Sequence, residues 1–154
     1  MKEQRTFASV GFATHAKTTR RARFLAEMEQ VVPWRQLCVL IEPVYPQAGD
    51  GRPPVGLERM LRIYFLQHWF NLSDPAAEEA LYDSEAMRAF AGIDLGRAPA
   101  PDETTICRFR HLLEQHDLGR HLFDAIGTHL AAQGLKVNRG TIVDATIIAA
   151  PSST

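Results

Sequence analysis

The sequence predicts a mainly α fold with an N-terminal helical hairpin, a helix-turn-helix-like group of helices and one β-strand at the end. Apolar residues recur at three- and four-residue steps over 18–134, which is the spacing of amphipathic helices. Ser, Thr or Asp at the start of these segments and Gly at several ends are typical helix caps. Only over 135–154 does the pattern change to the apolar, β-branched run of a strand.

The first two helices are expected over 18–32 and 34–43, on either side of Pro33, and together they would form the hairpin. The first helix is expected to start near Thr18 or Thr19, and either threonine can cap its free backbone amides. The segment 43–56 contains four prolines and three glycines. It is therefore expected to be a loop between the hairpin and the rest of the chain.

Three further helices are expected over 57–70, 73–83 and 84–92. The first of them is apolar nearly all round, so it should lie at the centre of a core or in a subunit interface. Ser73 and Ser84 are the expected N-caps of the other two. A polar, proline-rich connection follows these helices.

The last two helices are expected over 102–116 and 118–134, with Asp102 as the N-cap of the first. The strand after them cannot pair its backbone groups alone, so it implies a sheet that this sequence does not supply. We therefore expect a flexible basic arm over 1–17, one helical domain over 18–134, and the first strand of a second domain over 135–154.

Charge is unevenly distributed along the 154 residues, although the net charge is only −1. The first 24 residues carry six cations and one anion, so the remainder is acidic. Lys17, Arg20, Arg21 and Arg23 are expected to contact DNA phosphates, as basic arms do. A solvated, flexible segment would show the same charges.

The helix expected over 102–116 has the composition of a DNA-reading helix. Arginines suit phosphates and guanine edges, threonines form hydrogen bonds, and a helix N-terminus suits a phosphate. An ordinary amphipathic helix with a charged outer face fits the same pattern, and the connection before it is longer than a tight turn. The candidate DNA contacts on this helix are Thr104, Thr105, Arg108, Arg110 and His111.

Most catalytic and cofactor motifs are missing from the sequence. The six histidines and two cysteines form no HExxH or CxxC motif, and no Walker loop, GxGxxG or GxSxG occurs. No apolar run reaches the length of a membrane span, and no signal-peptide core is present. We therefore expect a cytoplasmic protein with no membrane partner and no small-molecule cofactor.

Asp144 is the one acidic residue in the terminal apolar strand. A buried carboxylate needs a metal, a cation or hydrogen-bond donors to offset its desolvation. Joined by carboxylates from later elements, it could hold divalent metals for phosphoryl transfer. A structural Asp paired with an Arg or with backbone amides fits equally well.

Four segments together resemble bacterial transposases of the insertion-sequence-five (InsH-like) family. They are RRARFLAEMEQVVPW, LERMLRIYFLQHWFNLSDPAAEEALYDSEAMRAFAGIDL, PDETTICRFRHLLEQHDL and GTIVDATIIAAPSST. The resemblance implies a helical region that binds the terminal inverted repeats of the element as double-stranded DNA and that assists homo-oligomerisation. It also implies a ribonuclease-H-like catalytic domain with an Asp-Asp-Glu triad, of which Asp144 is the first member.

The same resemblance implies Mg²⁺ as the cofactor of the full-length enzyme, with Asp144 as one metal ligand. The second Asp and the Glu of the triad are expected beyond this sequence, so the chain alone is expected to bind no catalytic metal and to be inactive. It would then keep DNA-end binding and self-association in the bacterial nucleoid. The alternative is a helical oligomerisation or interaction domain with little DNA affinity of its own.

Overall fold

The structure, a computed structural model, describes residues 17–47 and 55–134, and this part of the chain is mainly helical. The expected mainly α class is confirmed, and the helices follow the expected segments closely. Residues 1–16 of the expected arm over 1–17 and the whole expected strand over 135–154, with Asp144, lie outside the described residues. The helices are α2 (Arg20–Val31), α3 (Trp34–Ile41), the 3₁₀-helix η1 (Glu42–Val44), α4 (Leu57–Phe70), α5 (Asp74–Asp83), α6 (Glu85–Ala91), α7 (Glu103–Gln115) and α8 (Leu118–Ala132).

The helix starts are fixed by the caps that the sequence predicts. The side chains of Thr19, Ser73, Ser84 and Asp102 each accept a hydrogen bond from the backbone amide three residues later. Such a bond satisfies one of the amides that the first helical turn leaves free. Gly92 closes α6 with a φ of 75°, in the left-handed region that glycine adopts without strain.

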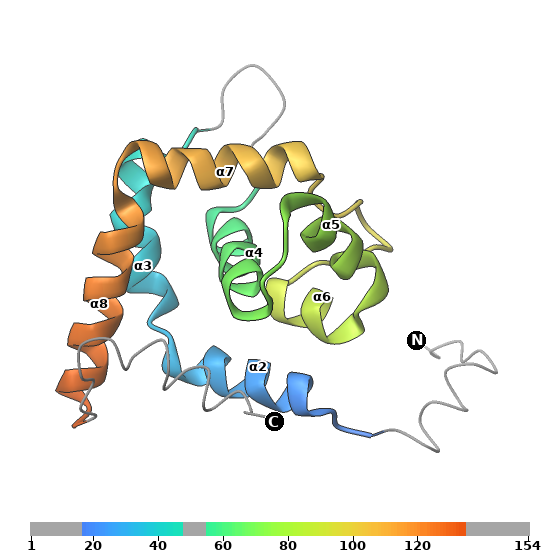
Figure 1. The fold of residues 1–154 in the computed structure, drawn as a ribbon, viewed down its shortest axis with the longest axis horizontal. Helices are drawn as coiled ribbons and strands as arrows, with labels where there is room; N and C mark the ends of the chain where they lie inside the picture. The colour runs from blue at the N-terminus through green and yellow to red at the C-terminus, as the bar shows by residue number, and fades with distance from the viewer. Residues whose placement is uncertain (1–16, 48–54, 135–154) are drawn as a thin grey trace, which may run out of the picture.

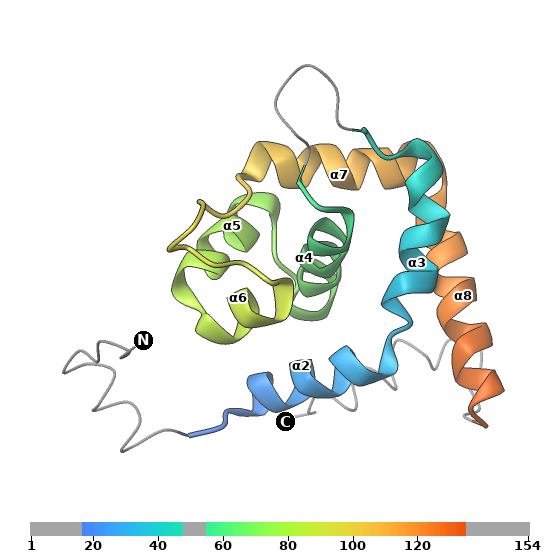
Figure 2. The same ribbon diagram turned by 180° about the vertical axis from the view of Figure 1, so that it is seen from behind.

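Helix α4 lies at the centre of the fold, between α5 and α6 on one side and α3 and α8 on the other (Figure 1). Its inner residues are 1% exposed or less, as an all-round apolar helix requires: Met60, Leu61, Ile63 and Leu66. Helix α7 lies across one end of this arrangement and α2 across the other, and both views agree on this (Figures 1 and 2). Helices α2 and α7 are therefore separated by the α4–α6 core.

Aromatic rings join α2, α3 and α6 to α4. The rings of Phe24 and Trp69 meet edge-on with centroids 5.2 Å apart, and those of Trp34 and Phe65 do so at 5.3 Å. The ring of Phe90 of α6 lies 5.7 Å from that of Trp69 in α4 and 5.5 Å from that of Trp34 in α3. Edge-to-face pairs add to the free energy gained from burial alone, so these rings fix how the outer helices sit on α4.

The first two helices do not form the expected hairpin. Helix α2 packs on α6, whereas α3 packs on α4 and α8. Val32 is extended and Pro33 has a ψ of 70°, so the chain changes direction between the two helices (Figure 2). The proline cannot continue the backbone ladder of α2, and each helix finds its apolar partner elsewhere. No helix in the described part of the chain is long and apolar enough to cross a bilayer.

Candidate nucleic-acid interface

Helix α7 presents a polar, partly basic stripe to solvent. Its inner side is buried through Ile106, Phe109 and Leu113. The opposite side is exposed, and its members follow at steps of four, three and four residues, so they align along one face. This outward face of α7 consists of Thr104, Arg108, His111 and Gln115.

The outward face of α7 contains three of the five candidate DNA contacts that the sequence places on this helix. Thr104, Arg108 and His111 are exposed, whereas Thr105 and Arg110 are half-buried. The Cys107 sulfur lies 3.8 Å from His111 Nε2 beside this face. Thr, Arg, His and Gln side chains all carry hydrogen-bonding groups that can meet base edges or phosphates.

The half-buried Arg110 binds carboxylates of the protein itself. Its guanidinium donates to the Asp74 carboxylate at 2.9 Å and to Glu114 at 3.0 Å. The hydrogen bond from Arg110 is the main reason that the pKa of Asp74 falls from its usual value to about 2. Gln67 of α4 also donates to Asp74, at 2.8 Å. Arg110 therefore joins α7 to the start of α5, and its charge is balanced by two carboxylates.

The N-terminus of α7 is closed by protein carboxylates. The amide of Glu103 donates to Glu78 of α5 at 2.6 Å, and that of Thr105 donates to Asp102 at 2.8 Å. Glu103 adds a third negative charge in the first turn. These acidic groups stabilise the positive end of the helix dipole. They also disfavour the phosphate that the sequence led us to expect at this helix end.

The basic residues around the start of α2 form a second positive surface. Lys17, Arg20, Arg21 and Arg23 are all exposed, and we call this group the basic turn. The guanidinium of Arg21 lies 5.0 Å from the centre of the Phe70 ring. Among the described residues, no ion pair involves the other three cations.

The structure does not bring the two sets of candidate DNA contacts together. Helix α2 packs on α6, α6 on α5, and α5 on α7. The basic turn and the outward face of α7 therefore lie on opposite sides of the core (Figures 1 and 2).

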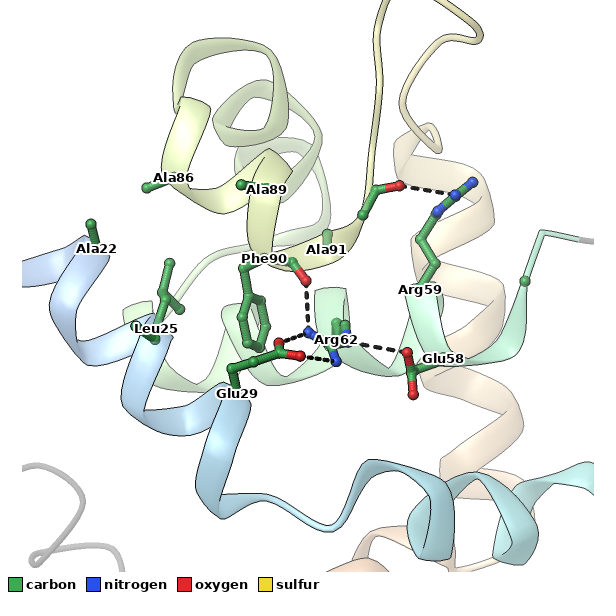
Figure 3. Close-up of a pocket in the computed structure, with 13 residues that line it drawn as sticks. Ala22, Leu25, Glu29, Glu58, Arg59, Arg62, Ala86, Ala89, Phe90 and Ala91 are labelled. Carbon is green, nitrogen blue, oxygen red and sulfur yellow. Dashed lines mark hydrogen bonds and ion pairs between the residues drawn. The ribbon is translucent and has the colours of Figure 1, made fainter. Parts of the chain in front are cut away.

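A groove of about 790 Å³ between α2, α6 and the start of α4 was not predicted. Alanines of α2 and α6 line it, with Arg62 on its floor (Figure 3). Arg62 donates to both Glu29 oxygens and to the Phe90 carbonyl, the latter at 2.9 Å, and lies 3.5 Å from Glu58. Its guanidinium also lies 4.5 Å from the centre of the Trp34 ring.

The charges in this groove serve the fold. Arg62 of α4 is only 8% exposed, and its hydrogen bonds to Glu29 of α2 and to the Phe90 carbonyl of α6 connect the three helices. Its hydrogen bond holds the pKa of the Glu29 carboxyl below the ordinary value. The position of Arg62 between the apolar residues Leu61 and Ile63 of α4 could have indicated its burial, because a buried guanidinium requires such partners.

The described residues contain no group of three or more His, Cys, Asp or Glu that could hold a metal ion. Asp144, the expected metal ligand, lies outside them, so its role stays a prediction.

The chain is similar to a known family of proteins. The family model described as "Transposase domain (DUF772)" matches residues 13–112, which is more than half of the chain. The matched range contains α2 to α6 and most of α7, and thus the basic turn and all of the outward face of α7 except Gln115. No solved structure matches the chain.

Proposed function

Because the chain belongs to the transposase domain family that matches residues 13–112, we propose that it is the DNA-binding part of an insertion-sequence transposase and binds the terminal inverted repeats of the element. The observation that carries this proposal is the outward face of α7, where Thr104, Arg108 and His111 stand exposed in one row. A helix with such a row fits the major groove of B-DNA.

Arg108 is the residue on which we place most weight. It is exposed, and no described carboxylate forms an ion pair with it, in contrast to Arg110. An arginine that is free in this way can pair with a guanine edge or a phosphate. The acidic N-terminus of α7 favours contact through the middle of the helix, where Arg108 lies.

A gel shift tests this function. The probe is a duplex taken from the DNA that flanks the coding sequence of the chain, and the competitor is the same duplex scrambled. We expect preference for the flanking duplex, and loss of about tenfold of that preference in Arg108→Ala. Arg97→Ala is the matched control, because Arg97 is an exposed arginine in the α6–α7 connection. Equal binding of both duplexes by the folded wild type would contradict the proposal.

A helical interaction domain is the second candidate, and one observation favours it. Helices α3 and α8 pack together and leave Val39 55%, Leu40 37% and Phe123 44% exposed. Exposed apolar side chains on neighbouring helices are a feature of protein interfaces. Sedimentation of the wild type and of Phe123→Ser tests this candidate: self-association that the substitution weakens, without DNA preference in the wild type, would favour it.

A further inference from the structure

The positive charges around the start of α2 lie at the helix end where positive charge is unfavourable. The first turn of α2 contains no acidic residue, as is also true of α3 and α8, whereas the first turns of α4, α5, α6 and α7 each contain Asp or Glu. Cations at the positive end of a helix dipole are unfavourable. The three arginines of the basic turn, Arg20, Arg21 and Arg23, lie at or close to this end, and the first acidic side chain after them is Glu27. A bound polyanion would relieve this repulsion.

The chemistry of the basic turn differs from that of the outward face of α7. The basic turn contains only lysine and arginine, and it lacks the Thr, His and Gln that α7 presents beside Arg108. Cations alone bind phosphates with little regard to base sequence. The two surfaces therefore suit two modes of DNA contact, one that is independent of sequence and one that reads bases.

The positions of the two surfaces exclude a shared short duplex. The outward face of α7 points away from its buried residues Ile106 and Phe109, and thus away from the core that separates it from α2. In both views α2 lies on the far side of that core (Figures 1 and 2). B-DNA is stiff over about 150 base pairs, so a short duplex along α7 cannot bend around the bundle to reach α2.

We propose that the basic turn binds a second DNA duplex, so that one chain holds two DNA segments on opposite sides of the α4–α6 core. This inference rests on the proposed DNA-binding function of α7. The segment at α7 is read by sequence, and the segment at the basic turn is held through its phosphates. A chain of this kind would join a specific DNA end to any neighbouring DNA.

Fluorescence energy transfer between two short duplexes tests this proposal with the full chain. The donor duplex has the flanking sequence and the acceptor duplex has the scrambled sequence. The test variant combines Lys17→Ala, Arg20→Ala and Arg23→Ala, and leaves Arg21 in place because it contacts Phe70. The matched control combines Arg35→Ala, Arg97→Ala and Arg120→Ala, which removes the same charge from exposed sites elsewhere.

We expect the wild type and the control to bring the two duplexes together. In the test variant, the energy transfer between the duplexes should be about tenfold lower. The test variant should keep the affinity for the flanking duplex within about twofold. Its binding to the scrambled duplex should depend less steeply on salt, with a log–log slope smaller by about 3.

Three results would overturn the two-duplex proposal: a wild type that joins no duplexes, a test variant that joins them as well as the wild type, or a test variant that loses both activities together. The second result would mean that associated copies each hold one duplex through α7. The third would mean that one duplex touches both surfaces. Failure of the proposed function is a separate outcome, since it appears as equal affinity for the flanking and scrambled duplexes.

Discussion

The Arg110 guanidinium donates to the Asp74 carboxylate at 2.9 Å and so connects the middle of α7 to the first residue of α5. Asp74 also accepts from Gln67 of α4, so three helices meet at one carboxylate. Its side chain is 14% exposed, which makes this contact largely shielded from water. This contact is one of those that hold α7 against α5, beside the hydrogen bond from Glu103 to Glu78.

Replacement of Asp74 by Asn should lower the free energy of unfolding by about 1–2 kcal/mol, because charged hydrogen bonds to Arg110 and Gln67 are weakened. Urea denaturation measures the change. Glu114→Gln is the control: the Glu114 side chain is 61% exposed, and its removal should cost about 0.5 kcal/mol or less. An equal loss in both variants would show that the Asp74 contact adds nothing beyond a surface ion pair.

The stabilisation by Asp74 should depend on pH. Its pKa is about 2 in the folded chain, below the ordinary value of 3.8. The folded state therefore favours the ionised carboxylate, and this contribution is complete above about pH 4 and is lost as the pH falls towards 2. Denaturation of the wild type and of Asp74→Asn between these pH values should show the two stabilities converge. A constant difference across this range would contradict the assignment.

Arg62 should be the most sensitive charged residue of the fold. Arg62→Ala removes the contacts to Glu29 and to the Phe90 carbonyl, and it leaves both without their partner. We expect a loss of about 2–4 kcal/mol. Arg59→Ala serves as the control, because the exposed Arg59 makes only one described hydrogen bond, to the Gly92 carbonyl. In thermal denaturation, the melting temperature of Arg62→Ala should be clearly lower than that of Arg59→Ala. Equal melting temperatures would contradict the structural role of Arg62.

Cys38 should react slowly with thiol reagents. Burial, followed by the nearby Glu58 and Glu42, raises the pKa of its thiol from 9.0 to about 11. Since the thiolate is the reactive form, its fraction near neutral pH falls about 100-fold. In a Cys107→Ser variant, the rate of alkylation should therefore rise by at least that factor on unfolding in urea. Similar alkylation rates in the folded and unfolded states would contradict the raised pKa of the buried Cys38 thiol.

Local sequence patterns predicted the helices well, because caps and apolar spacing act within a few residues. Thr19, Ser73, Ser84 and Asp102 begin their helices as expected. The inner side of α7, with Ile106, Phe109 and Leu113, follows from the helical period.

Contacts between distant residues could not be predicted in this way. Glu29 and Arg62 are 33 residues apart, and Glu78 and Glu103 are 25 apart. Local patterns therefore do not indicate that Glu78 accepts a hydrogen bond at the start of α7, or that Asp74 binds Arg110. Nor do they indicate that the basic turn and α7 lie on opposite sides, since this follows from the packing of α2 on α6.

The pairing of α3 with α8 has a consequence for the newly made protein. Helix α3 (34–41) has Leu37 and Ile41 fully buried and packs on α4 and α8, yet the segment 42–117 separates it from α8 in the sequence. On the ribosome, α3 emerges long before α8 has been translated. Its apolar side can then pack on α4 and, through Trp34, on Phe90 of α6, whereas the part that faces α8 stays without its partner until α8 leaves the exit tunnel.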